Sequence, residues 1–310
     1  MTLKNTHVVP QIAGLMQQGV TRRRCLGAGI AACLGSACSI DPDEDHTGRD
    51  APSSAELARK PRTAWVLSSG GPRGFAHIGV IKALAEMQLR PDLIVGASAG
   101  SLVGVLYCSG MSAPGIETLA IELQPWQLAR VNLSRGEAMS GAGVAQFVRS
   151  HLGQPLLQQL ATPVVCVAQR ISDGAAVGFN HGDAGAAVQA ACAIEGQFTP
   201  VRIHGQRYRD ADQCMPLPVR MARALGATRV LAIDASAFEE RAPPGSERYR
   251  AGDLRKRALT QPDAALADVV LRPDFGYWVN LSREFRERAI AAGYRATMAA
   301  AVRVGELHAG

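Results

Sequence analysis

The sequence predicts an α/β fold built on parallel strands, and two observations carry this prediction. Two strand-turn-helix units follow one another between Ala64 and Gly104. In each unit an apolar run of strand length is followed by a turn of small residues and then by a run compatible with a helix. Strands that alternate with helices in this way pair in parallel, because the helix returns the chain to the same end of the sheet.

The first turn predicts an anion-binding loop. Residues 69–74 read SGGPRG, follow the apolar strand 65–67 and open a helix. Free backbone N–H groups and the positive end of the helix dipole therefore gather at the carboxyl end of that strand. Pro72 fits the first turn of a helix, where its missing N–H has no partner to lose.

The second turn has the pattern of a nucleophile elbow. Residues 96–100 read G-x-S-x-G and follow the apolar run 93–95. The serine of such an elbow, here Ser98, sits on a strained turn, so the flanking positions must be nearly free of side chain, as Gly96 and Gly100 are. Taken alone, the motif fits either a catalytic serine or the packing of small residues between strand and helix.

The two turns together indicate acyl-transfer chemistry. Neighbouring parallel strands would place both turns at one edge of the sheet, where α/β folds bind ligands. Acyl transfer needs N–H donors beside the nucleophile, because negative charge develops on the carbonyl oxygen during attack. Pro72 has no N–H, which leaves as candidate oxyanion donors the backbone groups of Gly70, Gly71, Arg73 and Ala99. The Arg73 side chain is expected either to attract a phosphate headgroup or to brace the loop.

The elements further along the chain are marked by caps and turn signals. Ser112 and Pro114 open one helix, Asp183 caps another, and residues 172–174 (SDG) give a hairpin signal. The expected elements are helices at 113–123, 141–152, 184–193 and 282–302, strands at 163–168, 176–179, 228–234 and 269–271, and a hairpin at 201–208. Residues 239–263 are charged and contain Pro and Gly, which predicts a surface loop.

These motifs together resemble the patatin-like phospholipases, whose pattern is G-G-G-x-R-G followed by G-x-S-x-G. The resemblance covers Ser69 to Ala211, with a similar layout to about Pro273. It implies a three-layer fold with a mostly parallel central sheet and helices on both faces. It also implies a serine–aspartate dyad without a catalytic histidine, in which the aspartate comes from a later Asp-Gly or Asp-Ala pair. Ser98 is then the expected nucleophile and Asp210, followed by Ala211, the expected general base and acid, with no metal or organic cofactor.

Three departures from this pattern keep a second function open. Ser69 stands where the family usually has its first glycine, Ala211 replaces the commoner glycine, and Glu195 stands where a proline is usual. We expect Glu195 to be a solvated loop charge. The alternative to an enzyme is a catalytically degenerate, lipid-binding surface lipoprotein, although retention of both Ser98 and Asp210 favours the enzyme. A dinucleotide-binding module is disfavoured, because G-x-G-x-x-G is absent.

The positions of the histidines also favour a carboxylate base. In α/β-hydrolases the order is serine, acid, histidine, and the only histidine after Asp210 is His308, close to the end of the chain. His77 beside the glycine turn is more typical of a structural histidine. A partly desolvated carboxylate can deprotonate a serine hydroxyl. Asp210 is therefore the expected base, with Asp212 as a second candidate whose alternative role is turn formation.

Residues 1–38 are predicted to be an export signal. Arginines 22–24 precede a weakly apolar run at 27–37, and paired arginines favour the twin-arginine type. Cys33 and Cys38 each end a lipoprotein-like signal, with Cys38 slightly favoured because it leaves a longer apolar run. The protein is then expected in the periplasm or anchored there as a lipoprotein, with a cytoplasmic location as the alternative.

The rest of the chain is expected to be a tether and one domain. Residues 39–62 are polar and dotted with proline, which predicts a disordered tether, and residues 63–310 are expected to form a single catalytic domain. The formal net charge of +6 comes from arginines scattered among acids. This pattern disfavours nucleic acid and leaves an acyl lipid or phospholipid and a membrane surface as expected partners. The oligomeric state is not determined by the sequence.

Two further features carry predictions of their own. Residues 124–140 fit either a flap over the acyl site or a packed loop. Four cysteines after the signal lie in apolar or small-residue surroundings without metal-ligand spacing, which favours buried free thiols: Cys108, Cys166, Cys192 and Cys214.

Overall fold

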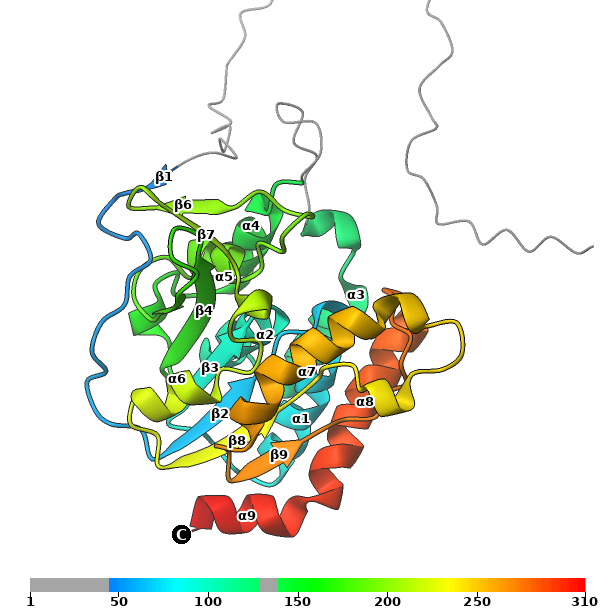
Figure 1. Cartoon of the computed structure of the whole chain (residues 1–310). Helices are drawn as coiled ribbons and strands as arrows, with labels where there is room; N and C mark the ends of the chain where they lie inside the picture. Colours follow the sequence, from blue (N-terminus) through cyan, green and yellow to red (C-terminus); the bar gives the residue numbers. More distant parts are fainter. Residues whose placement is uncertain (1–44, 129–138, 310) are drawn as a thin grey trace, which may run out of the picture. The chain divides into compact units, whose positions relative to one another are not determined.

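The computed structural model describes residues 45–128 and 139–309, and its central element is a mixed sheet (Figure 1). Along the sheet the strands follow the order β1 (Asp45–His46), β6 (Val201–Ile203), β7 (Gln206–Asp210), β4 (Val164–Arg170), β3 (Leu93–Ala97), β2 (Thr63–Leu67), β8 (Arg229–Ile233) and β9 (Val269–Leu271). From β4 to β9 neighbouring strands are parallel, whereas β5 (Ala176–Phe179) and β7 are antiparallel to β4. The predicted α/β fold with a mostly parallel sheet is confirmed.

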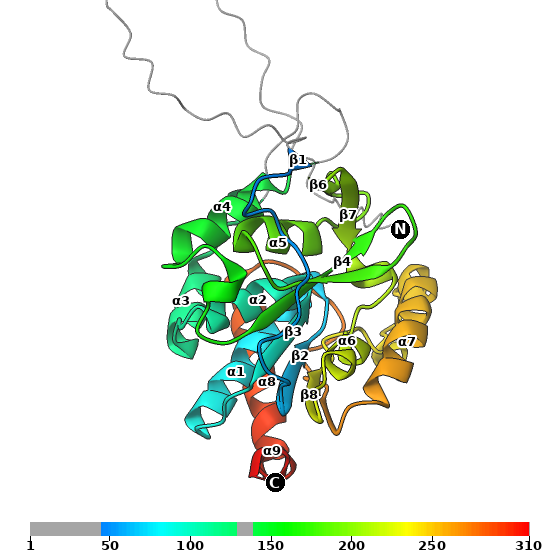
Figure 2. The same ribbon diagram turned by 90° about the vertical axis from the view of Figure 1, so that its left-hand side faces the viewer.

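Helices cover both faces of this sheet. Successive side chains of a strand point to opposite faces, and in the central strands both sets of side chains are apolar. Trp65 and Leu67 of β2 pack in one apolar cluster, and Ala64 and Val66 pack in another. The first cluster takes in α1 (Phe75–Glu86), α2 (Ala99–Cys108), α3 (Ala113–Glu122), α4 (Ala142–His151), α5 (Ala184–Ala191), α8 (Arg283–Ala299) and α9 (Ala301–Ala309). The second takes in α6 (Val219–Ala224) and the end of α7 (Arg250–Ala264). Figure 2 shows α6 and α7 on the opposite side of β2 and β3 from α1 and α3.

Helices α1 and α8 approach each other through glycines. A Cβ added at Gly79 would lie 1.7 Å from the carbonyl oxygen of Ile290, and one added at Gly293 would lie 2.0 Å from that of Ala76. No side chain fits at either position, so the two backbones are in direct contact. Helix α8 therefore fixes α1, the helix that continues from the glycine-rich turn.

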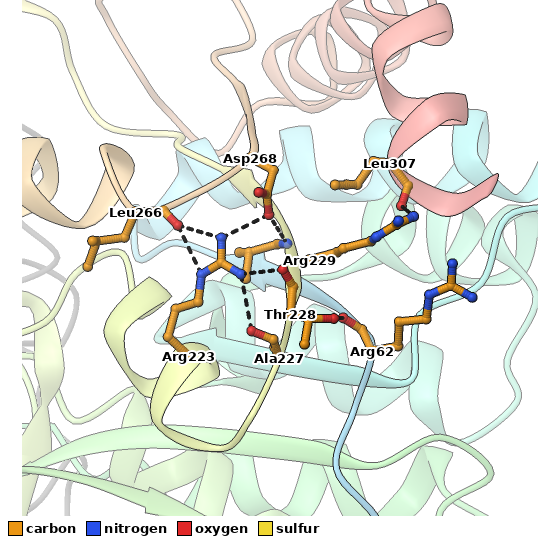
Figure 3. Close-up of polar contacts among 9 residues, drawn as sticks. Arg62, Arg223, Ala227, Thr228, Arg229, Leu266, Asp268 and Leu307 are labelled. Carbon is orange, nitrogen blue, oxygen red and sulfur yellow. Dashed lines mark hydrogen bonds and ion pairs between the residues drawn. The ribbon is translucent and has the colours of Figure 1, made fainter. Parts of the chain in front are cut away.

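An arginine of α6 holds the beginnings of two core strands in place (Figure 3). The Arg223 guanidinium donates to the carbonyl oxygens of Thr228 (2.7 Å) and Leu266 (2.7 Å) and pairs with Asp268 (2.9 Å). Thr228 directly precedes β8, and Asp268 directly precedes β9. Because Leu266 follows α7, the same contacts fix the end of that helix against α6.

Two sequence predictions are corrected by the structure. Residues 239–263 are not a loop, because they include most of α7. This helix buries only Thr260, Asp263 and Ala264 and contains Pro262, so it lacks the apolar stripe that reveals most helices.

The predicted disordered tether is wrong for residues 45–62, while residues 39–44 and the predicted signal lie outside the described residues. Strand β1 pairs with β6, the Ala55 N–H donates to Asn180 Oδ1 (2.8 Å), and the Ser54 hydroxyl donates to the Gly178 carbonyl (2.5 Å). Polar contacts hold this segment together with a few apolar side chains, among them Ala51 in the first apolar cluster and Leu57 against the second. The low apolar content explains why composition suggested disorder.

The remaining elements agree with the sequence to within a few residues, and Ser112 and Asp183 cap α3 and α5 as expected. The expected final helix is divided at Ala300 into α8 and α9. Of the segment 124–140, the structure describes a short turn at Pro125–Gln127 and residues 139–140; its centre lies outside the described residues. Within the described ranges, no helix is both long and apolar enough to cross a membrane.

Candidate active site

Ser98 lies on a strained turn between β3 and α2. Its φ of 52° and ψ of −123° put a non-glycine residue in a sparsely populated region, as a nucleophile elbow requires. A Cβ added at Gly96 would lie 2.5 Å from the Gly100 carbonyl carbon, and one added at Gly100 would lie 2.2 Å from the Leu67 carbonyl oxygen. The flanking glycines are therefore required by the close approach of the backbone.

The register of the sheet brings Asp210 to the end of β3. Ala97, the residue before Ser98, pairs with Val167 of β4, and Asp210 at the end of β7 pairs with the next residue, Ala168. Both Ser98 and Asp210 are 3% exposed. The Oδ1 atom of Asp210 accepts a hydrogen bond from the Asp212 N–H (2.9 Å), whereas the buried Oδ2 has no hydrogen-bond partner among the described residues.

Burial sets the protonation of this carboxyl group. Desolvation raises the pKa of Asp210 from its ordinary value to about 7, and the nearby Ser98 hydroxyl acts in the opposite direction. At neutral pH a substantial fraction of Asp210 is therefore ionised and still basic enough to accept a proton.

The thiols near this pair are not competing nucleophiles. Burial raises the pKa of Cys192, which lies close to Ser98 and Asp210, well above its ordinary value, and raises that of Cys214 to about 11. Cys108 and Cys166 are fully buried. All four are free and neutral near pH 7, as the sequence predicted for buried thiols, although Cys192 and Cys214 are partly exposed.

The glycine-rich turn lies directly against the elbow. A Cβ added at Gly74 would lie 2.4 Å from the Ala99 Cβ, so only a glycine lets the two turns meet. Gly71 has a φ of 53°, which favours glycine at this position too. The backbone N–H groups of Gly70, Gly71 and Ala99 have no hydrogen-bond partner among the described residues and remain available to an oxyanion.

The backbone N–H of Arg73 was expected to be an oxyanion donor, but it is not available for that role. Its N–H already donates to the Gly70 carbonyl (3.1 Å), which removes it from the available donors. Its guanidinium donates to the Tyr277 carbonyl (2.8 Å) and lies 5.9 Å from the centre of the Phe275 ring. Arg73 thus braces the loop, which was one of its two predicted roles, and burial lowers its pKa.

The other candidate bases are engaged elsewhere. His77 is buried with Nε2 2.9 Å from the Ser68 carbonyl, and burial lowers its pKa to about 4, so it is a neutral structural residue. His308 contacts the Trp65 indole N–H (3.0 Å). Asp212 accepts hydrogen bonds from Ser69 and Lys256, and the exposed Glu195 forms an ion pair with Arg209.

An apolar cavity of about 290 Å³ opens beside the two turns. Ser98, Ala99 and Gly71 form part of its wall, and the rest is mainly apolar side chains from α1 to α4 and the segment after α5, including Ile78, Leu102, Ile116, Leu119, Phe147 and Phe198. The sequence predicted the helix α3 but gave no sign that it lines a cavity. Within the described ranges, no group of three or more His, Cys, Asp or Glu side chains is placed to hold a metal ion.

Comparisons with known proteins identify relatives of this chain. An uncharacterized NTE family protein of Mycobacterium tuberculosis is 31% identical over 182 residues, which cover 58% of this chain and 50% of the relative. Patatin-like phospholipase domain-containing protein 6 of Homo sapiens is 29% identical over 187 residues, or 57% of this chain and 14% of the relative. The matched region thus spans about half of the mycobacterial protein and a small part of the human one.

A solved structure supports the fold, and a family model shows the family. The crystal structure of VipD from Legionella pneumophila has a TM-score of 0.53 and covers 81% of this chain and 70% of that chain; at 13% sequence identity it supports the fold alone. A family model for patatin-like phospholipases matches residues 65–223, just over half of the chain and the part that contains both turns and Asp210. The chain therefore belongs to the patatin-like phospholipase family.

Proposed function

We propose that this protein is a serine acyl hydrolase that cleaves ester bonds of lipids. The observation that carries the proposal is the apolar cavity of about 290 Å³ with Ser98 and free N–H groups in its wall. The family supports lipid ester hydrolysis in general, and one relative, 28% identical over 191 residues (58% of this chain and 12% of the relative), is named Lysophospholipase NTE1 in Coccidioides immitis.

The proposed reaction proceeds through a covalent acyl-enzyme. Asp210 accepts the proton of the Ser98 hydroxyl as its oxygen attacks the ester carbonyl. The N–H groups of Gly70, Gly71 and Ala99 stabilise the oxyanion of the tetrahedral intermediate. When the intermediate collapses, Asp210 protonates the leaving alcohol. It then takes a proton from the water that attacks the acyl-enzyme and returns that proton to the Ser98 oxygen as the fatty acid leaves.

The cavity supports a fatty acyl chain as the group bound beside Ser98. Its walls offer aliphatic and aromatic side chains and few polar partners, so it favours a methylene chain over a charged or sugar group. Each buried methylene contributes about 0.8 kcal/mol of transfer free energy. The apolar lining binds the acyl chain and does not select the leaving alcohol. The proposed substrate is therefore an acyl lipid or phospholipid, with no headgroup assigned.

A membrane surface is the proposed source of this substrate. Leu281, 44% exposed, also forms part of the cavity wall. Arg286 donates to the carbonyls of both Leu281 (3.0 Å) and Leu123 (2.5 Å), which ties the segment that leads to Trp126 to this side of the cavity. Trp126 lies in the chain between Leu123 and Leu128, which both line the cavity, and it is 72% exposed. Exposed aromatic and aliphatic side chains near such a cavity suit the lipid–water interface. Export by the twin-arginine route and lipidation at Cys38 or Cys33 remain proposals consistent with this location.

The test uses the full-length protein, a fluorophosphonate probe and para-nitrophenyl esters. We expect the wild type to be labelled and to turn over ester, Ser98→Ala to lose both, and Asp210→Asn to lose turnover. Ser109→Ala is the matched control, because its hydroxyl only donates to the Leu106 carbonyl at the end of α2 (2.7 Å). Folded wild-type protein that is neither labelled nor active would exclude the hydrolase and support the lipid-binding alternative.

A further inference from the structure

A chain of polar contacts connects helix α7 with the glycine-rich turn and with Asp210. Lys256 of α7 places its ammonium 2.7 Å from Asp212 Oδ1 and 3.5 Å from the Ser69 carbonyl oxygen. The Ser69 hydroxyl donates to the same carboxylate oxygen. The Asp212 backbone N–H donates to Asp210 Oδ1 (2.9 Å), so the network reaches the proposed base.

Both ends of this network are anchored. The Ser69 N–H donates to the Pro216 carbonyl (2.8 Å), and the next residue, Gly70, is one of the candidate oxyanion donors. At the other end, Arg220 of α6 pairs with the buried Asp263 of α7 (2.6 Å). The Lys256 side chain is 19% exposed and that of Asp212 is 37% exposed, so solvent reaches their pair mainly from the Asp212 side.

We infer that Lys256 and Asp212 are positioning residues for the proposed reaction: with Ser69 they hold the glycine-rich turn beside Asp210, and their opposite charges balance each other next to that base. This inference rests on the proposed function, in which Asp210 accepts the proton of Ser98. It also gives a role to the Ser69 hydroxyl. Family members with the usual glycine at this place have no such hydroxyl.

The groups that interact with Asp210 show why this pair controls its charge. They are Ser98, the thiols of Cys192 and Cys214, the Asp212 carboxylate and the Lys256 ammonium. Burial keeps both thiols neutral near pH 7, and Arg209, next in the chain, is paired with Glu195. Although burial acts to raise it, Lys256 and Ser69 hold the pKa of Asp212 below its ordinary value. Asp212 raises the pKa of Asp210, and Lys256 lowers it.

The experiment measures kcat/KM against pH for a soluble para-nitrophenyl ester with the full-length protein. In the wild type we expect an acid limb near pH 7, where Asp210 ionises. Lys256→Met leaves the Asp212 charge unbalanced and moves the limb to higher pH, whereas Asp212→Asn leaves the lysine unbalanced and moves it to lower pH. Each shift should be about half a pH unit or more. The double variant should return close to the wild-type limb, and Lys256→Arg should retain it.

A matched control removes the ion pair of another lysine, far from Asp210 in the chain. Lys82→Met breaks an equally short pair with Glu117 (2.7 Å) between α1 and α3 and should leave the limb in place. Limbs that do not move, or that move in the same direction in both single variants, would overturn the inference even if the rates fall.

A second readout separates this inference from the proposed function. The titration of the Asp210 carboxyl can be followed by carbon-13 NMR in the same variants without any turnover. Opposite shifts there support the charge balance, and unchanged titration overturns it. If Asp210 titrates as expected but Asp210→Asn keeps full turnover, the proposed dyad fails while the charge pair stands.

Discussion

Replacing Asp210 by asparagine should inactivate the protein and at the same time stabilise its fold above neutral pH. The Asp210 pKa of about 7 in the folded chain exceeds its ordinary value of 3.8, so the folded state binds the proton more tightly than the unfolded state. A raised carboxyl pKa makes the stability of the wild type fall as pH rises from about 4 to about 7, by up to about 1.4 kcal/mol per pH unit. Asparagine does not titrate and removes this loss.

The size of the effect follows from two opposing contributions. A difference of roughly 3 pKa units corresponds to about 4 kcal/mol. The new amide group places N–H donors where the carboxyl Oδ2 had no partner among the described residues, which costs about 1–3 kcal/mol. The net gain at about pH 8 is therefore on the order of 1–3 kcal/mol, or a rise in Tm of at least about 2 °C for a chain of this size.

Urea unfolding of the full-length wild type and variant between about pH 5 and about pH 8 measures this gain. The difference in free energy of unfolding should grow up to about pH 7 and then level off. Asp173→Asn is the control, because Arg170 and the Ala175 N–H hold the pKa of the exposed Asp173 below its ordinary value. This carboxylate is ionised in both the folded and the unfolded chain over the measured range, so its substitution should give a loss of stability that does not change with pH. A difference that is constant over the whole range would refute the assignment of a buried, protonated Asp210.

Three further predictions concern the turn, the cavity and the rim. Gly100→Ala should abolish labelling by the fluorophosphonate probe and lower Tm strongly, because its Cβ would lie 2.2 Å from the Leu67 carbonyl oxygen. The control Gly153→Ala, with open space around the added Cβ, should behave as wild type. Values of kcat/KM for para-nitrophenyl esters should rise about fourfold per methylene until the cavity is filled, and Leu119→Trp should move the optimum to shorter chains; a flat series would contradict an acyl site there. Trp126→Ser should weaken co-sedimentation with phosphatidylcholine vesicles while leaving turnover of a short soluble ester unchanged, and equal losses in both assays would argue against a membrane-facing rim.

The parts of the site that could be predicted from the sequence are those encoded by short-range patterns. Gly96 and Gly100 reveal the elbow because the steric demand acts two residues away from Ser98. Asp210 could be predicted only from the resemblance to a family motif. The hairpin that carries it lies more than a hundred residues after Ser98, and the pairing of Asp210 with Ala168 shows how it reaches the elbow. The roles of these residues stay predictions until the variants are measured.

The parts that were missed depend on contacts between distant segments. The Arg73 guanidinium reaches the Tyr277 carbonyl, 204 positions further along the chain, and nothing near Arg73 indicates such a partner. Lys256 was overlooked because α7 buries few residues and has no apolar stripe. The cavity is a volume left between four helices, and no single helix pattern encodes it.

The glycine contact between α1 and α8 also bears on when the protein becomes competent during synthesis. Helix α8 leaves the ribosome about 200 residues after α1, which at about 5–20 residues per second is a delay of about 10–40 s. During that interval Gly79 of α1 has no backbone to meet, and the turn that precedes α1 lacks its support. A nascent chain that already holds all three sequence motifs therefore lacks this backbone contact, and under the proposed function we expect it to be inactive until the last helices have docked.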